Sequence, residues 1–108
     1  TQVIDDRLWH NAGVIGMPAN DGTPRVWYTV LHPEDGGIRI EHRALDYDHT
    51  GAAEDMRRLG LPSGYADCIE TGLWPNLDVM PELEKTKSGA ELSERTVIWS
   101  RPVMAAAE

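Results

Sequence analysis

The stretch RVWYTVLHPEDGGIRIEHRAL, residues 25–45, decides the fold of this chain. Its opening run, residues 25–31, is largely apolar on both alternating faces, as in a strand covered on both sides. Residues 32–37 contain a proline, an aspartate and two glycines, which together reverse the chain. Residues 38–45 then alternate apolar with charged side chains, as in a strand with one exposed face. The stretch therefore predicts an antiparallel hairpin.

The residues before this hairpin contain further turn signals. Residues 8–10 form a short extended segment, and Gly13 and Gly16 punctuate a turn that leaves it. A loop over residues 17–24 contains Asn-Asp-Gly with a proline on each side, which is a strong turn pattern. We therefore expect residues 1–45 to consist mainly of strands.

The residues after the hairpin predict short helices. Apolar residues at helical spacing indicate a helix over residues 52–59, with Thr50 as its N-cap and Gly60 at the C′ position. In that Schellman stop, Leu61 packs on Met56. Because a helix shorter than about 12 residues is marginal in water, we expect this one to need a docking surface.

The same punctuation predicts a second helix, which Pro62 opens in its first turn and Gly72 ends. Asp78 is a suitable cap for a third short helix that ends near Ser88, and residues 96–99 form a last β-like stretch. Residues 46–108 are thus expected to be mainly short helices. The inner face of the second helix is expected to consist of Tyr65, Cys68 and Ile69.

Composition restricts the possible partners. The chain has 108 residues, with 18 acidic and 10 basic side chains, a net charge of −8 and a pI near 4.8. An acidic surface disfavours nucleic acid and anionic membranes as partners. No apolar run has the length of a membrane span, and the single cysteine, Cys68, forms no intramolecular disulfide. We therefore expect one cytoplasmic unit, which by its initial Thr1 is a piece of a longer chain.

Few residues suggest chemistry on their own. Asp46-Tyr47-Asp48-His49 offers three potential ligands, but adjacent strand residues point to opposite faces, so helix capping is the preferred interpretation over a metal site. His10 stands beside the glycine turn, where it is either a structural histidine or, with the turn, part of a small-ligand site. Cys68 is expected to be a buried, inert thiol, and the four tryptophans are expected to anchor the core.

The order of segments carries more information than any single motif. It resembles the C-terminal part of small calcineurin-like metallophosphoesterases of the bacterial and archaeal phosphodiesterase type, over roughly residues 8–85. The family pattern runs N-P-G-S-V-G-x-P, then D-G-x-P-R, then an apolar strand. The matching residues here are NAGVIGMP (11–18), NDGTPRVWYTVL (20–31), Arg43, Tyr47 with Asp48, GLP (60–62) and GLWP (72–75).

The resemblance implies a fold and an activity for a larger protein. The family fold is a four-layer α-β-β-α sandwich, to which this chain would contribute a hairpin and short C-terminal helices. The family binds two divalent metal ions of the Mn, Fe, Zn or Ni type and hydrolyses phosphoester substrates. Its metal motifs D-x-H, G-N-H-[DE] and G-H-[TS]-H do not occur here, so this chain alone is expected to bind no metal and to be inactive.

The resemblance also places a loop. Asn11, Gly13 and Gly16, with His10 beside them, would lie near the metal centre and support it through their backbone, with no catalytic role. The chain departs from the family pattern at Ala12, where proline is usual, and at residues 14–15, where Ser-Val is usual. The alternative is a small acidic interaction module that buries its exposed hairpin in a homo-oligomer or against another partner.

Overall fold

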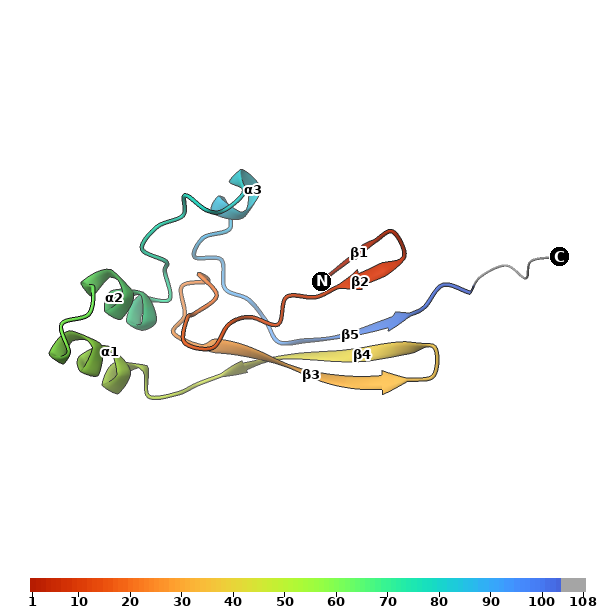
Figure 1. The fold of residues 1–108 in the computed structure, drawn as a ribbon, viewed down its shortest axis with the longest axis horizontal. Helices are drawn as coiled ribbons and strands as arrows, with labels where there is room; N and C mark the ends of the chain where they lie inside the picture. Colours follow the sequence, from red (N-terminus) through yellow and green to blue (C-terminus); the bar gives the residue numbers. More distant parts are fainter. Residues whose placement is uncertain (104–108) are drawn as a thin grey trace.

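The computed structural model describes residues 1–103 and shows a mixed α+β chain, as the sequence predicts (Figure 1). Residues 1–45 contain four strands, and residues 46–103 contain three short helices and one further strand. The elements are β1 (Gln2–Ile4), β2 (Arg7–Trp9), β3 (Val26–Glu34), β4 (Gly37–Leu45), α1 (His49–Arg58), α2 (Ser63–Thr71), α3 (Glu82–Lys85) and β5 (Arg95–Ser100).

The predicted hairpin is confirmed, with a tighter turn than expected. β3 and β4 are antiparallel from Val26 opposite Leu45 to Glu34 opposite Gly37. Only Asp35 and Gly36 remain in the turn, so residues 32–34 belong to the strand rather than to the reversal. A two-residue loop of this kind needs positive φ, which Gly36 supplies at 73°.

The sheet has a third strand that local patterning did not connect to the hairpin. β5 pairs antiparallel with β4, with Ser100 opposite Gly37, and gives the order β3-β4-β5. A separate two-stranded sheet joins β1 and β2 through a turn at Asp5 and Asp6, which have φ of 51° and 58°. β1 was not predicted, because a three-residue strand carries almost no periodic signal.

The expectation that β3 is covered on both sides is wrong. Trp27 is buried, but Tyr28 is 46% exposed and Leu31 is 56% exposed. The reason is the placement of the helices, because α1 and α2 lie beyond the end of the sheet and not over its faces (Figure 1). Apolar residues on both faces of β3 therefore remain open to solvent.

α1 begins earlier than predicted. Its N-cap is Asp48 and not Thr50, because the Asp48 Oδ1 accepts a hydrogen bond from the Gly51 N–H at 3.0 Å. Its C-terminal stop is confirmed as a Schellman motif, since the Leu61 N–H donates to the Met56 carbonyl at 3.0 Å. Residues 46–49 thus follow the end of β4 and cap α1, which agrees with the helix-capping interpretation of this sequence.

α2 packs against α1 with a slightly different face from the one predicted. Ala66, Cys68 and Ile69 are buried, whereas Tyr65 is 49% exposed. Pro62 stands at the N-cap and not in the first turn, and Gly72 ends the helix as expected. The helices are also joined by an ion-pair cluster, in which the guanidinium of Arg57 on α1 contacts Asp67 and Glu70 on α2.

The third helix is shorter than predicted, and Pro81 rather than Asp78 precedes it. Asp78 is exposed and does not cap α3, and its backbone N–H donates to the Asn76 Oδ1 at 2.7 Å.

The chain is elongated and has little core. It measures 67 × 29 × 21 Å with a radius of gyration of 17.8 Å, whereas a compact domain of this length has about 13 Å. The buried apolar residues fall into a pair in the sheet and a group between the helices. They are Trp27 and Ile40 in the first, and Ala53, Ala66 and Ile69 in the second, while Cys68 on α2 is buried apart from that group.

The prediction that tryptophans anchor the core holds for Trp27, which is 6% exposed. It is wrong for Trp9, which is 60% exposed because the β1–β2 hairpin has no layer over it. Trp74 and Trp99 are half-buried.

Candidate functional site

His10 lies where the β1–β2 hairpin meets the three-stranded sheet. It follows directly on β2, and both of its ring nitrogens have hydroxyl partners. Nδ1 is 2.9 Å from the Thr1 hydroxyl, and Nε2 is 2.8 Å from the hydroxyl of Thr29 on β3. Because both nitrogens are engaged, the ring is a structural contact here and not a free ligand group.

His42 on β4 completes this cluster. It stands opposite Thr29 in the β3–β4 register, and its ring meets the His10 ring edge-on, with the ring centroids 5.2 Å apart. It also meets the Trp27 indole edge-on at 4.8 Å. The His42 Nδ1 and the Trp27 Nε1 are both buried without a hydrogen-bond partner, which is unusual for polar atoms in a folded protein.

Both rings titrate in an unfavourable setting for positive charge. Burial lowers the pKa of His10, and the α-amino group and Arg95 lower it further. Burial also lowers the pKa of His42, with His10, Arg95 and the α-amino group adding to the effect. Arg95 lies on β5 directly opposite His42. The sequence did not predict that His10 and His42 lie together. The turn at residues 35–36 nevertheless fixes a register that places Thr29, the hydrogen-bond partner of His10, opposite His42.

The loop over residues 11–16 follows His10 and is exposed. The Asn11 Oδ1 accepts a hydrogen bond from the Gly13 N–H at 3.0 Å. Gly13 has φ of 95°, and a Cβ there would lie 3.2 Å from the Trp27 carbonyl, so the chain passes closely over β3. Ile15 is 98% exposed and Gly16 faces open space.

The structure thus brings together only part of the predicted loop site. His10 and Asn11 line an open hollow of about 250 Å³ together with Thr1, Gln2 and Trp9. Gly13 instead packs on β3, and no atom lies within 4 Å of the Cβ position at Gly16.

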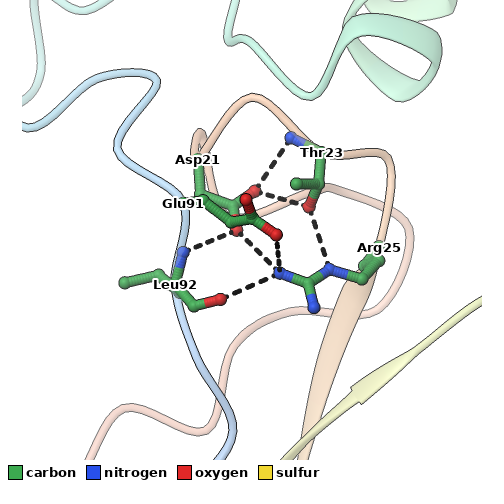
Figure 2. Close-up of polar contacts among 5 residues, drawn as sticks. All are labelled: Asp21, Thr23, Arg25, Glu91 and Leu92. Atoms are coloured by element: carbon green, nitrogen blue, oxygen red, sulfur yellow. Dashed lines mark hydrogen bonds and ion pairs between the residues drawn. The ribbon is translucent and has the colours of Figure 1, made fainter.

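A second polar cluster, which we call the Asp21 joint, connects two segments of the chain, residues 21–25 and residues 91–92 (Figure 2). It consists of Asp21, Thr23, Arg25, Glu91 and Leu92. Asp21 is only 2% exposed, yet its carboxylate accepts four hydrogen bonds. Oδ1 accepts from the N–H and hydroxyl of Thr23 at 3.1 and 2.8 Å. Oδ2 accepts from the Leu92 N–H at 3.1 Å and from the Arg25 Nη2 at 3.4 Å.

Arg25 balances the buried charge of Asp21. Its Nη2 also donates to the Leu92 carbonyl at 2.9 Å and lies 3.6 Å from the Glu91 carboxylate. Its guanidinium carbon lies 5.2 Å from the centre of the Trp27 ring. Burial by itself would raise the pKa of Asp21, but the hydrogen bonds from Leu92 and Thr23 and the charge of Arg25 lower it overall.

Neighbouring residues extend this joint to the end of α2. Asn20 is 4% exposed, and its Oδ1 accepts from the Trp74 N–H at 2.9 Å. The Trp74 indole N–H donates to the Pro18 carbonyl at 2.7 Å. The Gly22 N–H donates to the Gly72 carbonyl at 3.2 Å. Residues 18–25 therefore form a hub in which Pro18, Asn20 and Asp21 are buried, where the sequence predicted only a loop.

A signal for this hub was present in the sequence. In Asp21-Gly22-Thr23, the aspartate can accept from the N–H two residues on, which is the usual aspartate turn. An arginine four residues after the aspartate can neutralise it. Tertiary partners such as Leu92, which lies 71 residues away, carry no comparable signal.

The residues in hand do not fit the two metal ions that the family resemblance implies. Within residues 1–103, no three or more His, Cys, Asp or Glu side chains come together where they could hold an ion. Asp48 is committed to the cap of α1, and the His49 Nδ1 lies 3.3 Å from the Tyr47 carbonyl. Cys68 is buried and its pKa is raised by that burial, so it is a poor ligand and nucleophile.

The helices of residues 1–103 are all too short, or too polar, to cross a bilayer. Comparison of the chain with protein-family models, with curated proteins and with solved structures finds no match.

Proposed function

We propose that this chain is the C-terminal part of a metal-dependent phosphoesterase, in which the metal ligands belong to a preceding part of the protein. One observation carries the proposal. The segments that resemble the family, residues 11–31 and 72–75, are far apart in the sequence but meet in the hub around Asn20 and Trp74. Segments that resemble one family pattern and also pack together support the proposal more strongly than the motifs taken singly.

The open sheet supports the same proposal. A layer of a four-layer sandwich is covered by other layers, and β3 exposes apolar side chains such as Tyr28 and Leu31 on both of its faces. In the proposed parent, the missing layers lie against these faces. The exposed loop over residues 11–16 is then free to approach the metal-binding part and to support it through its backbone.

The two metal ions would activate water and stabilise charge during phosphoester hydrolysis in the parent. The residues described here contribute none of the ligands, so their part in the activity is structural. The Asp21 joint fixes the hub, and Gly13 on Trp27 fixes the start of the loop.

The proposal is tested by reading the coding frame upstream of Thr1 and assaying its full product. We expect a longer frame that carries D-x-H, G-N-H-[DE] and G-H-[TS]-H, and a product that hydrolyses bis-p-nitrophenyl phosphate with manganese. The 108-residue chain is the matched inactive control. A frame that opens just before Thr1, or a full product without manganese-dependent hydrolysis, overturns the proposal.

The exposed apolar side chains favour one alternative, a small module that associates with itself or a partner. Trp9 in the β1–β2 sheet, and Leu31 and Ile98 on opposite faces of the three-stranded sheet, are 60%, 56% and 68% exposed, and a partner could cover such apolar side chains. Sedimentation velocity on the 108-residue chain tests this. A stable dimer at micromolar concentration supports the module, and a monomer with a cooperative unfolding transition counts against it.

A further inference from the structure

The N-terminal segment is attached to the rest of the molecule by very little. Among residues 1–103, one hydrogen bond joins residues 1–16 to the remainder, between the His10 Nε2 and the Thr29 hydroxyl. β1 and β2 pair only with each other, and a two-stranded sheet alone is marginally stable. Apart from the packing of Gly13 on Trp27, the segment is therefore held on the sheet by the contacts of His10.

The surroundings of His10 place positive charges together. The edge-on His10 and His42 rings have centroids 5.2 Å apart. The cationic side chain that acts on both rings is Arg95, which lies on β5 directly opposite His42. This grouping stands out in a chain with a net charge of −8.

We propose that His10 and His42 form a pH-sensitive latch, which holds the β1–β2 hairpin and the loop over residues 11–16 on the sheet while both rings are neutral and releases them when the rings are protonated. The latch goes beyond the proposed phosphoesterase function and does not depend on it.

Charge, and not loss of the hydrogen bond, opens the latch. The Thr1 and Thr29 hydroxyls can accept as well as donate, so a protonated His10 keeps both of its partners. Two imidazolium rings at this separation repel each other, and Arg95 adds to the repulsion. A protonated His42 would also carry a buried Nδ1–H with no acceptor, which is costly. Separation of the hairpin from the sheet relieves both penalties.

The direction of the pH dependence follows from the same groups. The pKa values of both rings are lowered when the segment is attached, so the detached segment binds protons more readily. Attachment is therefore fully stable above the usual histidine value of 6.5. It weakens as the pH falls below that value and towards the lowered pKa values.

Nuclear magnetic resonance on the 108-residue chain tests the latch. Between about pH 7.5 and about pH 5, we expect several-fold loss of the nuclear Overhauser contacts between the His10 ring and the Thr29 methyl group. Amide shifts of residues 2–9 should move towards random-coil values with the same midpoint, while those of β3 and β4 stay in place. His10 and His42 should titrate below 6.5.

Variants give the decisive comparison. The double variant His10→Gln, His42→Phe has no titratable side chain at either position, so the contacts of residues 2–9 should no longer depend on pH. His32→Gln is the matched control, because His32 lies on the opposite face of β3 and its loss should leave the response intact. If the double variant responds like the parent chain, the proposal is overturned. If it does not fold, the parent chain decides, and titration of both rings at 6.5 or above overturns the proposal.

Discussion

The Asp21 joint and the His10–His42 latch are both polar contacts at junctions between segments, but they are built in opposite ways. In the joint, a carboxylate that is 2% exposed faces Arg25 and accepts four hydrogen bonds. In the latch, two histidines face each other and Arg95, and the His42 Nδ1 has no partner. In the joint, Arg25 neutralises the charge of Asp21. In the latch, protonation of the histidines brings like charges together.

This difference determines which junction can open. Breaking the Asp21 joint leaves a buried charge without its partners, so the joint resists separation. Opening the latch lets cationic groups move apart into water, so it becomes favourable once the rings are charged. The hub over residues 18–25 is therefore a permanent connection between sheet and helices, whereas the N-terminal segment is held conditionally.

The largest effect is expected where the backbone itself closes the joint. Gly72 has φ of 74°, and a Cβ there would overlap the backbone of Thr23. We expect Gly72→Ala to lower the free energy of unfolding by more than about 3 kcal/mol, from left-handed strain plus the forced separation of α2 from the hub. Urea denaturation followed by circular dichroism measures the change.

Gly60→Ala is the matched control for that measurement. Gly60 has the same φ of 74° and ends α1 as Gly72 ends α2, but nothing lies within 4 Å of its Cβ position. Its substitution should therefore show strain alone, at about 1 kcal/mol. Equal effects of the two substitutions would mean that the approach of Gly72 to Thr23 contributes nothing.

A smaller effect is expected from the charge of the joint. Asp21→Asn keeps the shape of the side chain but turns an NH₂ group towards N–H donors, and should destabilise the chain by about 2 kcal/mol. Asp78→Asn is the control, because Asp78 is exposed and its change should be within about 0.5 kcal/mol of zero. The comparison would break if both substitutions had similar effects in urea denaturation.

The pH dependence of this substitution sharpens the comparison with the latch. The pKa of Asp21 is lowered in the folded chain, so its contribution is present above the usual value of 3.8 and is lost as the pH falls through the lowered pKa. Asp21→Asn should thus lower stability at neutral pH and have less effect in strong acid. As the pH falls below 6.5 the latch starts to weaken, whereas the joint keeps its full contribution down to about 3.8.

Local sequence signals predicted the parts of the fold that local interactions determine. The β3–β4 hairpin and the Schellman stop at Gly60 depend on neighbours in the chain, and both are confirmed. The burial of β3 depends on where the helices lie, which no periodicity encodes, and that expectation is wrong. Of the candidate site, His10 was singled out for its place beside the glycine turn, but the sequence did not show its partner His42, whose position depends on the register of the hairpin.

The Asp21 joint shows the same limit from the other side. The aspartate turn to Thr23 is local, so the sequence contained a signal for it. The Asp21 carboxylate also accepts a hydrogen bond from the Leu92 N–H. These two residues meet only because β5, which follows Leu92, returns to pair with β4. Long-range partners of this kind turn a predicted loop into a partly buried hub.

The smallest effect is expected from a matched pair of threonines, one in each junction. Thr29→Val removes the hydroxyl that holds His10, and should cost about 1 kcal/mol, the usual net value of a neutral hydrogen bond. Thr23→Val removes a hydroxyl that donates to a buried carboxylate, and should cost about 2 kcal/mol, because hydrogen bonds to charged groups are stronger. The two effects should also differ in extent. Hydrogen exchange should increase only in residues 1–16 for Thr29→Val, but also in residues 72–74 and 88–92 for Thr23→Val. If Thr29→Val loosened the hub as well, the two junctions would be one cooperative unit, and the N-terminal segment could not open by itself.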